Sequence, residues 1–280
     1  MSDKHKLFLK ESENIAFDAD HRKRISFNMA RYDEAVEKGK AIYNNLESAK
    51  KKASEIKLKV IRDLDKYIID FTENFEKKGG KVLFAEADKD AARYVLDIAF
   101  KNEAKKIVKS KSMITEEIEL NDLLEKNEIE SLESDLGEYI VQIAGEKPYH
   151  IVTPAMHKSK EDIAKLFHEK FGISEQSTPE EITSFVRDLL RKKFLDADMG
   201  ITGANFVVAN QGLVALTENE GNGFMSFSFP KTHIVICGIE KIIPDIQDLD
   251  LFWPLLATHG TGQHMTVYNS LISGPRQSGE

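Results

Sequence analysis

A glycine-rich loop near residue 220 carries more polar groups than a simple turn requires. The stretch TENEGNG at 217–223 sets carboxylates and amides around glycines. Its candidate ligand-contacting residues are Glu218, Asn219, Glu220, Gly221, Asn222 and Gly223. A tight hairpin needs little more than an Asn-Gly pair. A hairpin turn and a ligand-facing loop are both compatible with the residues, and the excess of polar groups favours the ligand-facing loop.

A second candidate loop, KSKSMITEE at 109–117, runs from the end of an expected strand into an expected helix. Ligands of open α/β sheets bind beyond the carboxyl ends of strands, and a helix N-terminus offers N–H donors to an anion. Lys111, Ser112, Thr115 and Glu116 are the side chains that could join such a site. The structural alternative is a Thr115 that only caps the helix and a solvated Lys111.

Two further segments add candidates to the same expected pocket. Thr202 and Gly203 lie in a glycine-containing turn before a strand, and Gly262 lies in a similar turn within HGTGQH. His233 follows Pro230 and is a candidate anion contact, as is Lys231. No serine–histidine–carboxylate set is evident, so the catalytic residues stay unknown. If carboxylates do acid–base work, the candidates are Glu116, Glu117, Glu218 and Glu220.

Known cofactor motifs are missing from the sequence. It contains no HExxH, CxxC, GxGxxG after the first strand, GxxxxGK[ST] or GxSxG pattern. The single cysteine, Cys237, excludes an internal disulfide and a cysteine-ligated cluster within this chain. Its apolar neighbours favour a buried hydrophobe over a reactive thiol. We therefore expect no metal and no cofactor bound by this chain.

The expected elements indicate an α/β protein with an N-terminal helical arm. Residues 1–78 are nearly free of glycine and proline, and helices are expected over 31–52 and along an apolar stripe from Ile61 to Phe75 that Gly79 and Gly80 end. Strands expected at 81–87, 104–110 and 129–134 alternate with helices at 89–102 and 115–126, which predicts a largely parallel sheet. The arm (1–78) and the α/β domain (79–280) are expected to form one structural unit.

The rest of the chain shows two further patterns. Helices are expected at 159–171 and 179–195, the second with Thr178 as N-cap and Glu181 completing a capping box. Short strands follow at 204–210, 212–219, 233–240 and 264–273, with one helix near 245–257. Strands joined without helices predict an antiparallel or mixed addition to the sheet.

Composition narrows the functional class. Residues 1–78 carry 18 Lys/Arg and 15 Asp/Glu, and the remainder carries 21 and 32, within a net charge of −8. An acidic body argues against nucleic-acid binding. Because no apolar run approaches the ~20 residues of a membrane helix, we expect no membrane insertion. The N-terminal residues lack the apolar core of a signal peptide, so a cytoplasmic location is expected.

Several blocks in one order resemble a known family. The segments VKSKSMITEEIELNDLLEKNEIESLESDLGEYIVQIAGEKPYHIVTPAMHKSKEDIAKLF, ADMGITGANFVVANQGLVALTENEGNG and GTGQHMTVYNSLISGPR resemble the LUD domain of the iron–sulfur lactate utilization family. The resemblance covers nearly the whole chain. It implies a mixed sheet of the NagB/RpiA/CoA-transferase-like type, flanked by helices.

The resemblance also implies a function. Members of that family resemble electron carriers in a system that oxidises L-lactate to pyruvate, with 4Fe-4S clusters held by a C-terminal ferredoxin-like domain. This sequence ends at GPRQSGE, where the family would continue, so we expect the clusters in a full-length protein and other subunits of the lactate-oxidising system as partners. The alternative is an enzyme of the isomerase or CoA-transferase-like type that binds a small anionic ligand, such as a sugar phosphate or acyl-CoA.

Overall fold

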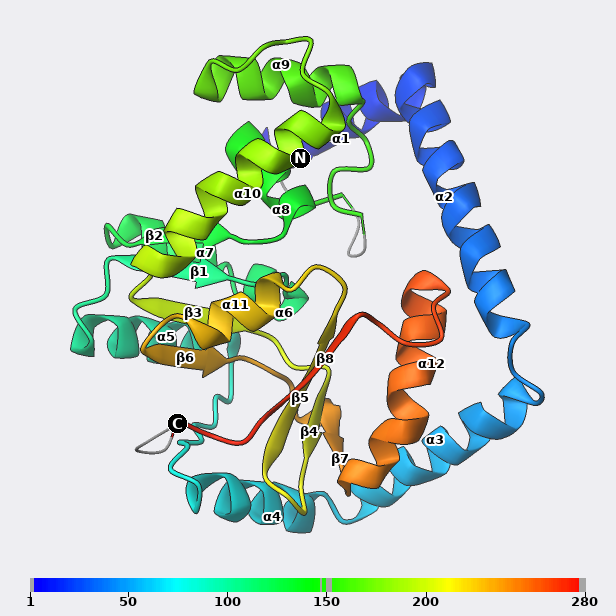
Figure 1. Cartoon of the computed structure of the whole chain (residues 1–280), viewed down its shortest axis with the longest axis vertical. Coiled ribbons are helices and arrows are strands. Elements are labelled where there is room, and N and C mark those ends of the chain that lie inside the picture. Colours follow the sequence, from blue (N-terminus) through cyan, green and yellow to red (C-terminus); the bar gives the residue numbers. More distant parts are fainter. Residues whose placement is uncertain (1–2, 147, 150–152, 277–280) are drawn as a thin grey trace.

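The computed structural model describes residues 3–146, 148–149 and 153–276 (Figure 1). It is a mixed α/β structure with two four-stranded sheets and an N-terminal set of helices. This confirms the predicted fold class. Along the described chain, no helix combines the length and apolarity needed to cross a membrane.

The N-terminal helices form the predicted arm, which runs along one side and the base of the body (Figure 1). They are α1 (Asp3–Phe17), α2 (Ala19–Lys40), α3 (Leu46–Arg62) and α4 (Leu64–Glu76). The single helix predicted over 31–52 is wrong, because α2 ends at Lys40 and Asn45 caps a new helix by accepting from the Ser48 N–H. The apolar stripe is likewise divided at Asp63, which leaves Ile61 exposed.

The first sheet is parallel throughout, and we call it the parallel sheet. Its order is β2 (Glu130–Glu133), β1 (Lys106–Lys109), β3 (Met199–Thr202) and β6 (Thr232–Val235). Side chains alternate between its faces. Ile107 and Ile201 pack with α5 (Asp88–Lys101) and α7 (Leu120–Lys126), whereas Val108 packs with α9 (Lys160–Phe171) and α10 (Pro179–Asp196). Helices therefore cover both faces, as expected for a sheet built from strand–helix–strand units.

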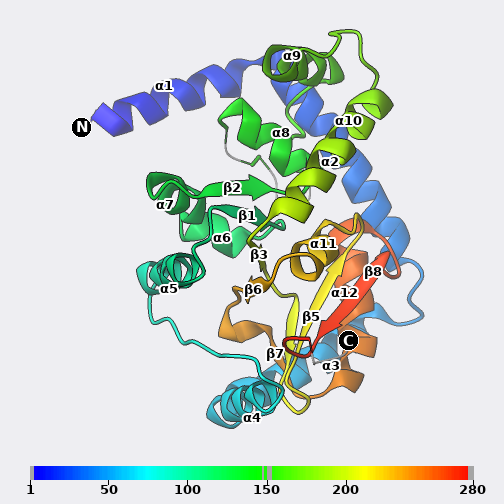
Figure 2. The ribbon, with the colours of Figure 1, turned by 60° about the vertical axis from the view of Figure 1, so that its left-hand side comes forward.

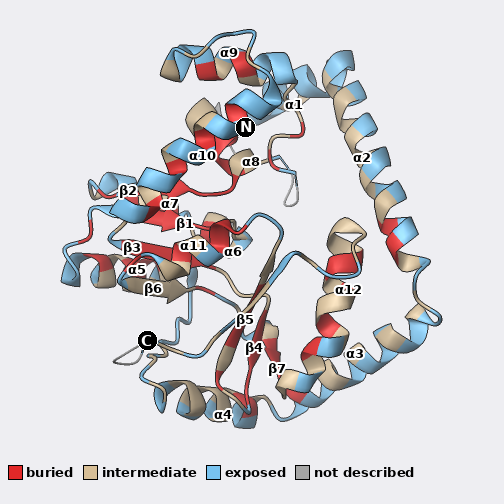
Figure 3. Cartoon of the chain, in the orientation of Figure 1, coloured by how far each residue is buried: buried red, intermediate tan, exposed pale blue. Residues whose placement is uncertain are grey.

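The second sheet is mixed. Its order is β7 (Ile242–Ile243), β4 (Phe206–Val208), β5 (Leu213–Glu218) and β8 (Tyr268–Ile272). β5 pairs antiparallel with β4 and β8, and β4 pairs parallel with β7. Side chains of α3, α4 and α12 (Leu249–Thr261) pack against its apolar residues, so the arm closes this part of the core. Buried residues gather on both sheets and the inner helix faces (Figure 3).

The remaining elements are short. They are α6 (Met113–Glu117), α8 (Leu136–Ala144), α11 (Asn222–Ser228) and two 3-10 turns, Ile239–Lys241 and Ile246–Asp248. The helix predicted over 115–126 is divided because Glu119 has a left-handed φ of 51° between α6 and α7. The Thr178–Glu181 capping box of α10 is confirmed.

Three other predictions are corrected by the structure. Residues 81–87 form no strand, because this segment pairs with no strand of either sheet and leaves Leu83 and Phe84 exposed. The C-terminal strands β4, β5, β7 and β8 form a separate sheet and do not extend the first. Cys237 is exposed because β6 ends at Val235, so the prediction of a buried core cysteine is wrong.

Two glycines allow the arm to approach the body closely. A Cβ added to Gly39 of α2 would overlap the backbone of Gly262, and one on Gly262 would overlap the backbone of Ala35. Gly262 also has a φ of +75° at the C-cap of α12. Because neither glycine has a side chain, the backbones of α2 and of the end of α12 can lie in direct contact.

We expect Gly39→Ala to lower the free energy of unfolding by about 1–3 kcal/mol, because the new methyl forces α2 away from α12. The matched control is Gly260→Ala, where a Cβ meets nothing within 4 Å. Alanine there should stabilise α12 by about 0.5–1 kcal/mol. Urea denaturation of the two variants measures both effects, and equal losses would contradict the close-approach explanation.

Candidate functional site

Most buried polar residues of the described structure gather where the strands of the parallel sheet end. We call this region the carboxyl edge, and it comprises residues 109–112, 133–138 and 202–203. The connection 218–223, from β5 into α11, joins it because α11 packs against β1 and β3. TENEGNG therefore links a strand to a helix, and the hairpin alternative is wrong.

A fully buried lysine lies at the centre of the carboxyl edge. Lys109 ends β1, and the parallel register sets it opposite Glu133 at the end of β2. Its Nζ lies 2.8 Å from Oε1 of Glu133 and 3.4 Å from Oε1 of Glu116, and it donates to Oγ1 of Thr115 at 2.7 Å. The side chain of Lys109 has no exposed surface, and only 4% of the Glu133 side chain is exposed. A buried ammonium is tolerated because these three oxygens replace its water.

A second buried carboxyl group faces Glu133. Glu138 comes from the first turn of α8 and is 5% exposed. Burial, and then the negative charge of Glu133, raise the pKa of Glu138 to about 8. Hydrogen bonding to Glu133 also favours the protonated form of Glu138 and so acts in the same direction on its pKa. Oε2 of Glu133 and Oε2 of Glu138 are both buried, and neither has a hydrogen-bond partner among the described residues.

Further carboxylates surround this pair on the side of α11. Nζ of Lys111 lies 3.8 Å from Oδ2 of Asp135. Burial is the main cause of the raised pKa of Glu218 and of Glu220, and the charge of Asp135 adds to both. Asn222, which is buried, donates to Oε2 of Glu220 at 3.3 Å. Carboxylates therefore outnumber lysines at this edge.

Two of the helix N-termini at the carboxyl edge, those of α11 and α8, are capped by carboxylates of the chain itself. Glu218 accepts from the N–H groups of Gly223 and Phe224 at 2.7 and 2.6 Å, at the start of α11. Asp135 accepts from the Glu138 N–H at 3.1 Å, at the start of α8. At α11 and α8, N–H donors that could hold a bound anion are thus already satisfied by carboxylates.

The other predicted site residues fall into separate contacts. Oγ1 of Thr202 lies 2.8 Å from Nε2 of His233. Burial lowers the pKa of His233 to about 4, so its ring is neutral at pH 7. Ser112 lies against Gly203, where an added Cβ would come within 2.8 Å of its Oγ. Asn219 donates to Oε1 of Gln263 at 2.8 Å, which ties its loop to the loop after α12.

The structure therefore brings some predicted residues together and separates others. Thr115 and Glu116 contact Lys109; Lys111, Glu218 and Glu220 lie around Asp135; Gly221 and Gly223 shape the start of α11. Gly262 lies apart, at the contact of α2 with α12. Sequence reasoning missed Lys109, Glu133 and Glu138. The available signal was a lysine ending the apolar run KIVK, in a strand expected to be buried.

Within the described ranges, no group of three or more His, Cys, Asp or Glu side chains could hold a metal ion. This edge can hold a proton on Glu138, close to Glu133 and the buried ammonium group of Lys109. Glu138 can accept or release this proton when its environment changes.

Sequence comparison identifies the family to which the two sheets and their polar edge belong. The chain belongs to the LUD domain family, whose pattern matches residues 68–280.

Named relatives agree with this family. The chain is 48% identical over 233 residues to lactate utilization protein B of Bacillus pumilus (strain SAFR-032), covering 83% of this chain and 49% of the relative. It is 45% identical over 236 residues to lactate utilization protein B 2 of Bacillus mycoides (strain KBAB4), covering 84% and 50%. The chain spans about half the length of the curated relatives it matches. No solved structure matches it.

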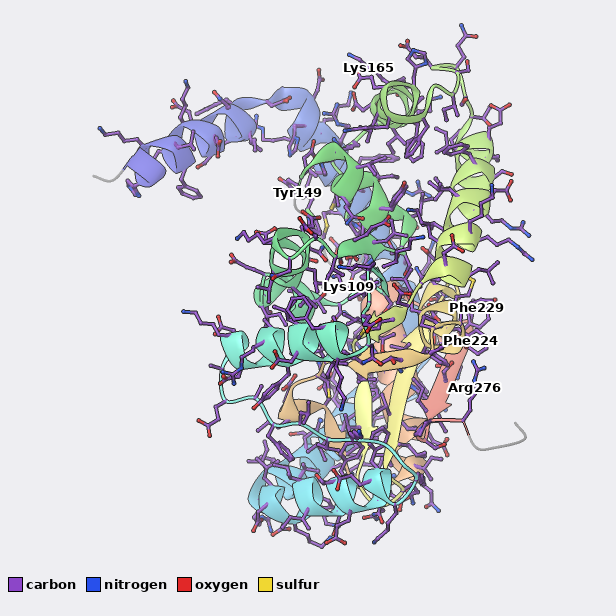
Figure 4. All side chains as sticks on the ribbon, turned by 90° about the vertical axis from the view of Figure 1, so that its left-hand side faces the viewer. Lys109, Tyr149, Lys165, Phe224, Phe229 and Arg276 are labelled. Carbon is purple, nitrogen blue, oxygen red and sulfur yellow. The ribbon has the colours of Figure 1, made fainter. Side chains whose placement is uncertain are left out.

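We expect Lys109→Met to lower the free energy of unfolding by about 3–5 kcal/mol, because Glu133 is then a buried charge without its cation. Lys165→Met is the matched control, since its side chain is 70% exposed on α9 (Figure 4). It should change stability by less than about 0.5 kcal/mol. Adding Glu133→Gln to Lys109→Met should recover part of the loss. Denaturant unfolding gives all three values, and a Lys109→Met variant as stable as the control would contradict the central role of this lysine.

The raised pKa of Glu138 gives stability a defined pH dependence. Between the ordinary pKa of 4.5 and about 8, the folded state binds more protons at this residue than the unfolded chain. Raising the pH through this window therefore lowers the contribution of Glu138 to stability, by up to about 1.4 kcal/mol per pH unit. Above about pH 8 no further loss is expected.

Glu138→Gln tests this dependence because it keeps the shape and removes the ionisation. The free energy of unfolding of wild type minus that of the variant should fall from pH 5 to pH 8. Glu180→Gln, at an exposed site in the first turn of α10, should give a flat difference. A flat difference for Glu138→Gln as well would show that Glu138 ionises normally.

Proposed function

We propose that this chain is the LUD-domain part of a component of an L-lactate utilization system, which oxidises L-lactate to pyruvate. The observation that carries the proposal is 45–48% identity over 83–84% of the chain to proteins named lactate utilization protein B. The proposed whole protein is an electron-transfer component with 4Fe-4S clusters outside this chain. The other subunits of the system are its proposed partners, and the cytoplasm is its proposed location.

In this proposal the domain supplies a rigid scaffold and a proton-holding edge, and electrons travel elsewhere. Oxidation of a hydroxyl carbon to a carbonyl releases protons, and a site that holds a proton beside a fixed ammonium suits a protein that works with such a reaction. A small anionic ligand at this edge has less support, because Glu218 and Asp135 already occupy the N–H donors of α11 and α8. The isomerase or CoA-transferase-like alternative is correspondingly not favoured.

A chimeric protein tests the function directly. In a Bacillus pumilus strain that lacks its lactate utilization protein B, the 233-residue segment matching this chain is replaced by the corresponding stretch of this chain within the full-length relative. We expect growth on L-lactate to return, with growth on glucose unchanged. The chimera that carries Lys165→Met should also restore growth on L-lactate. The chimera that carries Lys109→Met should support little growth on L-lactate. Absence of growth from a chimera present at the level of the native protein would contradict the proposal.

A further inference from the structure

The last strand of the mixed sheet has a neighbour on one side only. Among the described strands β8 pairs with β5 alone, so it forms an edge of the sheet. Figure 2 shows β8 at the outer side of that sheet, next to α11. An edge strand offers unpaired backbone N–H and C=O groups to an added strand, and proteins usually oppose such pairing with charged side chains or proline. Residues 265–275 contain no Asp, Glu, Lys or Arg, and their one proline lies beyond β8.

Exposed apolar side chains lie on both faces of β8. Residues opposite one another in an antiparallel pair lie on the same face of a sheet. Tyr268 is opposite Glu218, which caps α11, so the exposed Tyr268 lies on the face toward α11. Leu271 is opposite Ala215, which belongs to the apolar cluster that includes Phe252 of α12, so the exposed Leu271 lies on the other face. An extended segment paired with β8 would place its alternate side chains beside these two residues.

The helix α11 extends this apolar surface. A Cβ added to Gly221, at the N-cap of α11, would lie 3.4 Å from the Tyr268 ring, and Arg276 donates to the carbonyl of the last residue of α11. The helix therefore contacts residues at the start of β8 and beyond its end. Phe224 and Phe229 are exposed, and Figure 4 shows both on the same side of the molecule as Arg276. We call the edge of β8 and its exposed apolar neighbours the β8 surface: Phe224, Phe229, Val267, Tyr268 and Leu271.

The length of the relatives indicates what covers the β8 surface. The chain matches 49% of the Bacillus pumilus relative and 50% of the Bacillus mycoides relative, so about half of each protein lies outside the match. Domains of one chain pack against each other through interfaces of roughly 600–1,500 Å². An uncharged strand edge flanked by exposed aromatic side chains suits an interface of this kind, because it offers backbone groups for pairing and apolar surface for burial.

We propose that the β8 surface is the docking site for the half of the whole protein that this chain does not cover, and that an extended apolar segment of that half pairs with β8 as an added strand. The inference rests on the proposed function, in which this chain is one part of a longer protein. Backbone hydrogen bonds to β8 hold the segment, and its alternate side chains pack beside Tyr268 on one face and Leu271 on the other. In this arrangement the second half follows the present chain and starts near Arg276, so its tether to β8 is short and its local concentration high.

Amide hydrogen exchange tests the proposal. It compares the 280-residue chain with a full-length chimera, in which residues 1–280 replace the matching segment of the Bacillus pumilus relative. We expect the amides of β8 to exchange at least tenfold more slowly in the chimera, because the added strand accepts from N–H groups that otherwise face water. Amides of α9, which packs on the parallel sheet, should exchange alike in both proteins.

Two results of this comparison would overturn the proposal. The first is equal exchange of the β8 amides in the two proteins. The second is protection of β8 in the 280-residue chain that fades on dilution, because a second copy of the chain would then be the occupant of the edge.

Leu271→Lys tests the strand edge, because a lysine on an edge strand opposes the addition of another strand. In the chimera it should increase the exchange rate of the β8 amides at least tenfold. The 280-residue chain with the same change should keep its melting temperature, which shows that β8 itself is intact. Leu58→Lys is the matched control, since Leu58 is 55% exposed on α3 and Leu271 is 41% exposed. A Leu271→Lys chimera with the β8 protection of its parent would contradict strand addition.

Phe229→Ser tests the part of the β8 surface that lies on α11. It should increase β8 exchange at least threefold in the chimera and leave the 280-residue chain unchanged. Phe27→Ser, at an exposed position on α2, should have no effect on β8 in either protein. Equal effects of the two serine variants would show that α11 takes no part in the docking.

The exchange measurement and the growth test can fail separately. Exchange is measured on purified protein without lactate, and the same chimera can be placed in the growth test. A chimera that protects β8 and does not restore growth contradicts the proposed function alone. A chimera that restores growth while β8 exchanges as in the 280-residue chain overturns the docking site alone.

Discussion

The buried ammonium group of Lys109 is the interaction on which the carboxyl edge depends. Taking this charge out of water is costly, and three neighbouring groups replace the lost hydration: Glu133, Glu116 and Thr115. These partners come from β2 and α6, so one side chain fixes the end of a strand and the start of a helix together. Lys109 holds Glu133 in place, and burial together with the negative charge of Glu133 favours a proton on Glu138.

The two sheets are joined through the same region. β5 belongs to the mixed sheet, yet its last residue, Glu218, caps α11, and α11 packs on β1 and β3 of the parallel sheet. The loop 218–223 is therefore rich in carboxylates and amides because it must satisfy helix N–H groups at a crowded junction. This accounts for the polar excess of TENEGNG without a bound molecule. Of the two glutamates in that loop, Glu220 is the more exposed.

Short sequence patterns correctly predicted the helices and strands that depend on interactions between residues close in the chain. The capping box of Thr178 and Glu181, the strands around KIVK and ESLE, and the helical arm each depend on residues a few positions apart, and all are present. The site was less predictable because Lys109, Glu133 and Glu138 meet only through the parallel register of β1 and β2. At residues 81–87 the local pattern predicted a strand that the structure does not form. Their composition suits a strand, but pairing requires a neighbouring edge, and none is next to them among the described strands.

The proton held by Glu138 also alters how the folded chain behaves in an electric field. The formal net charge of −8 counts every glutamate as ionised. A Glu138 that stays protonated up to about pH 8 makes the folded chain one unit less negative at neutral pH than its composition states. Glu218 and Glu220, whose pKa values are also raised, act in the same direction under mildly acidic conditions. Unfolding at neutral pH therefore releases the proton that Glu138 holds in the native chain.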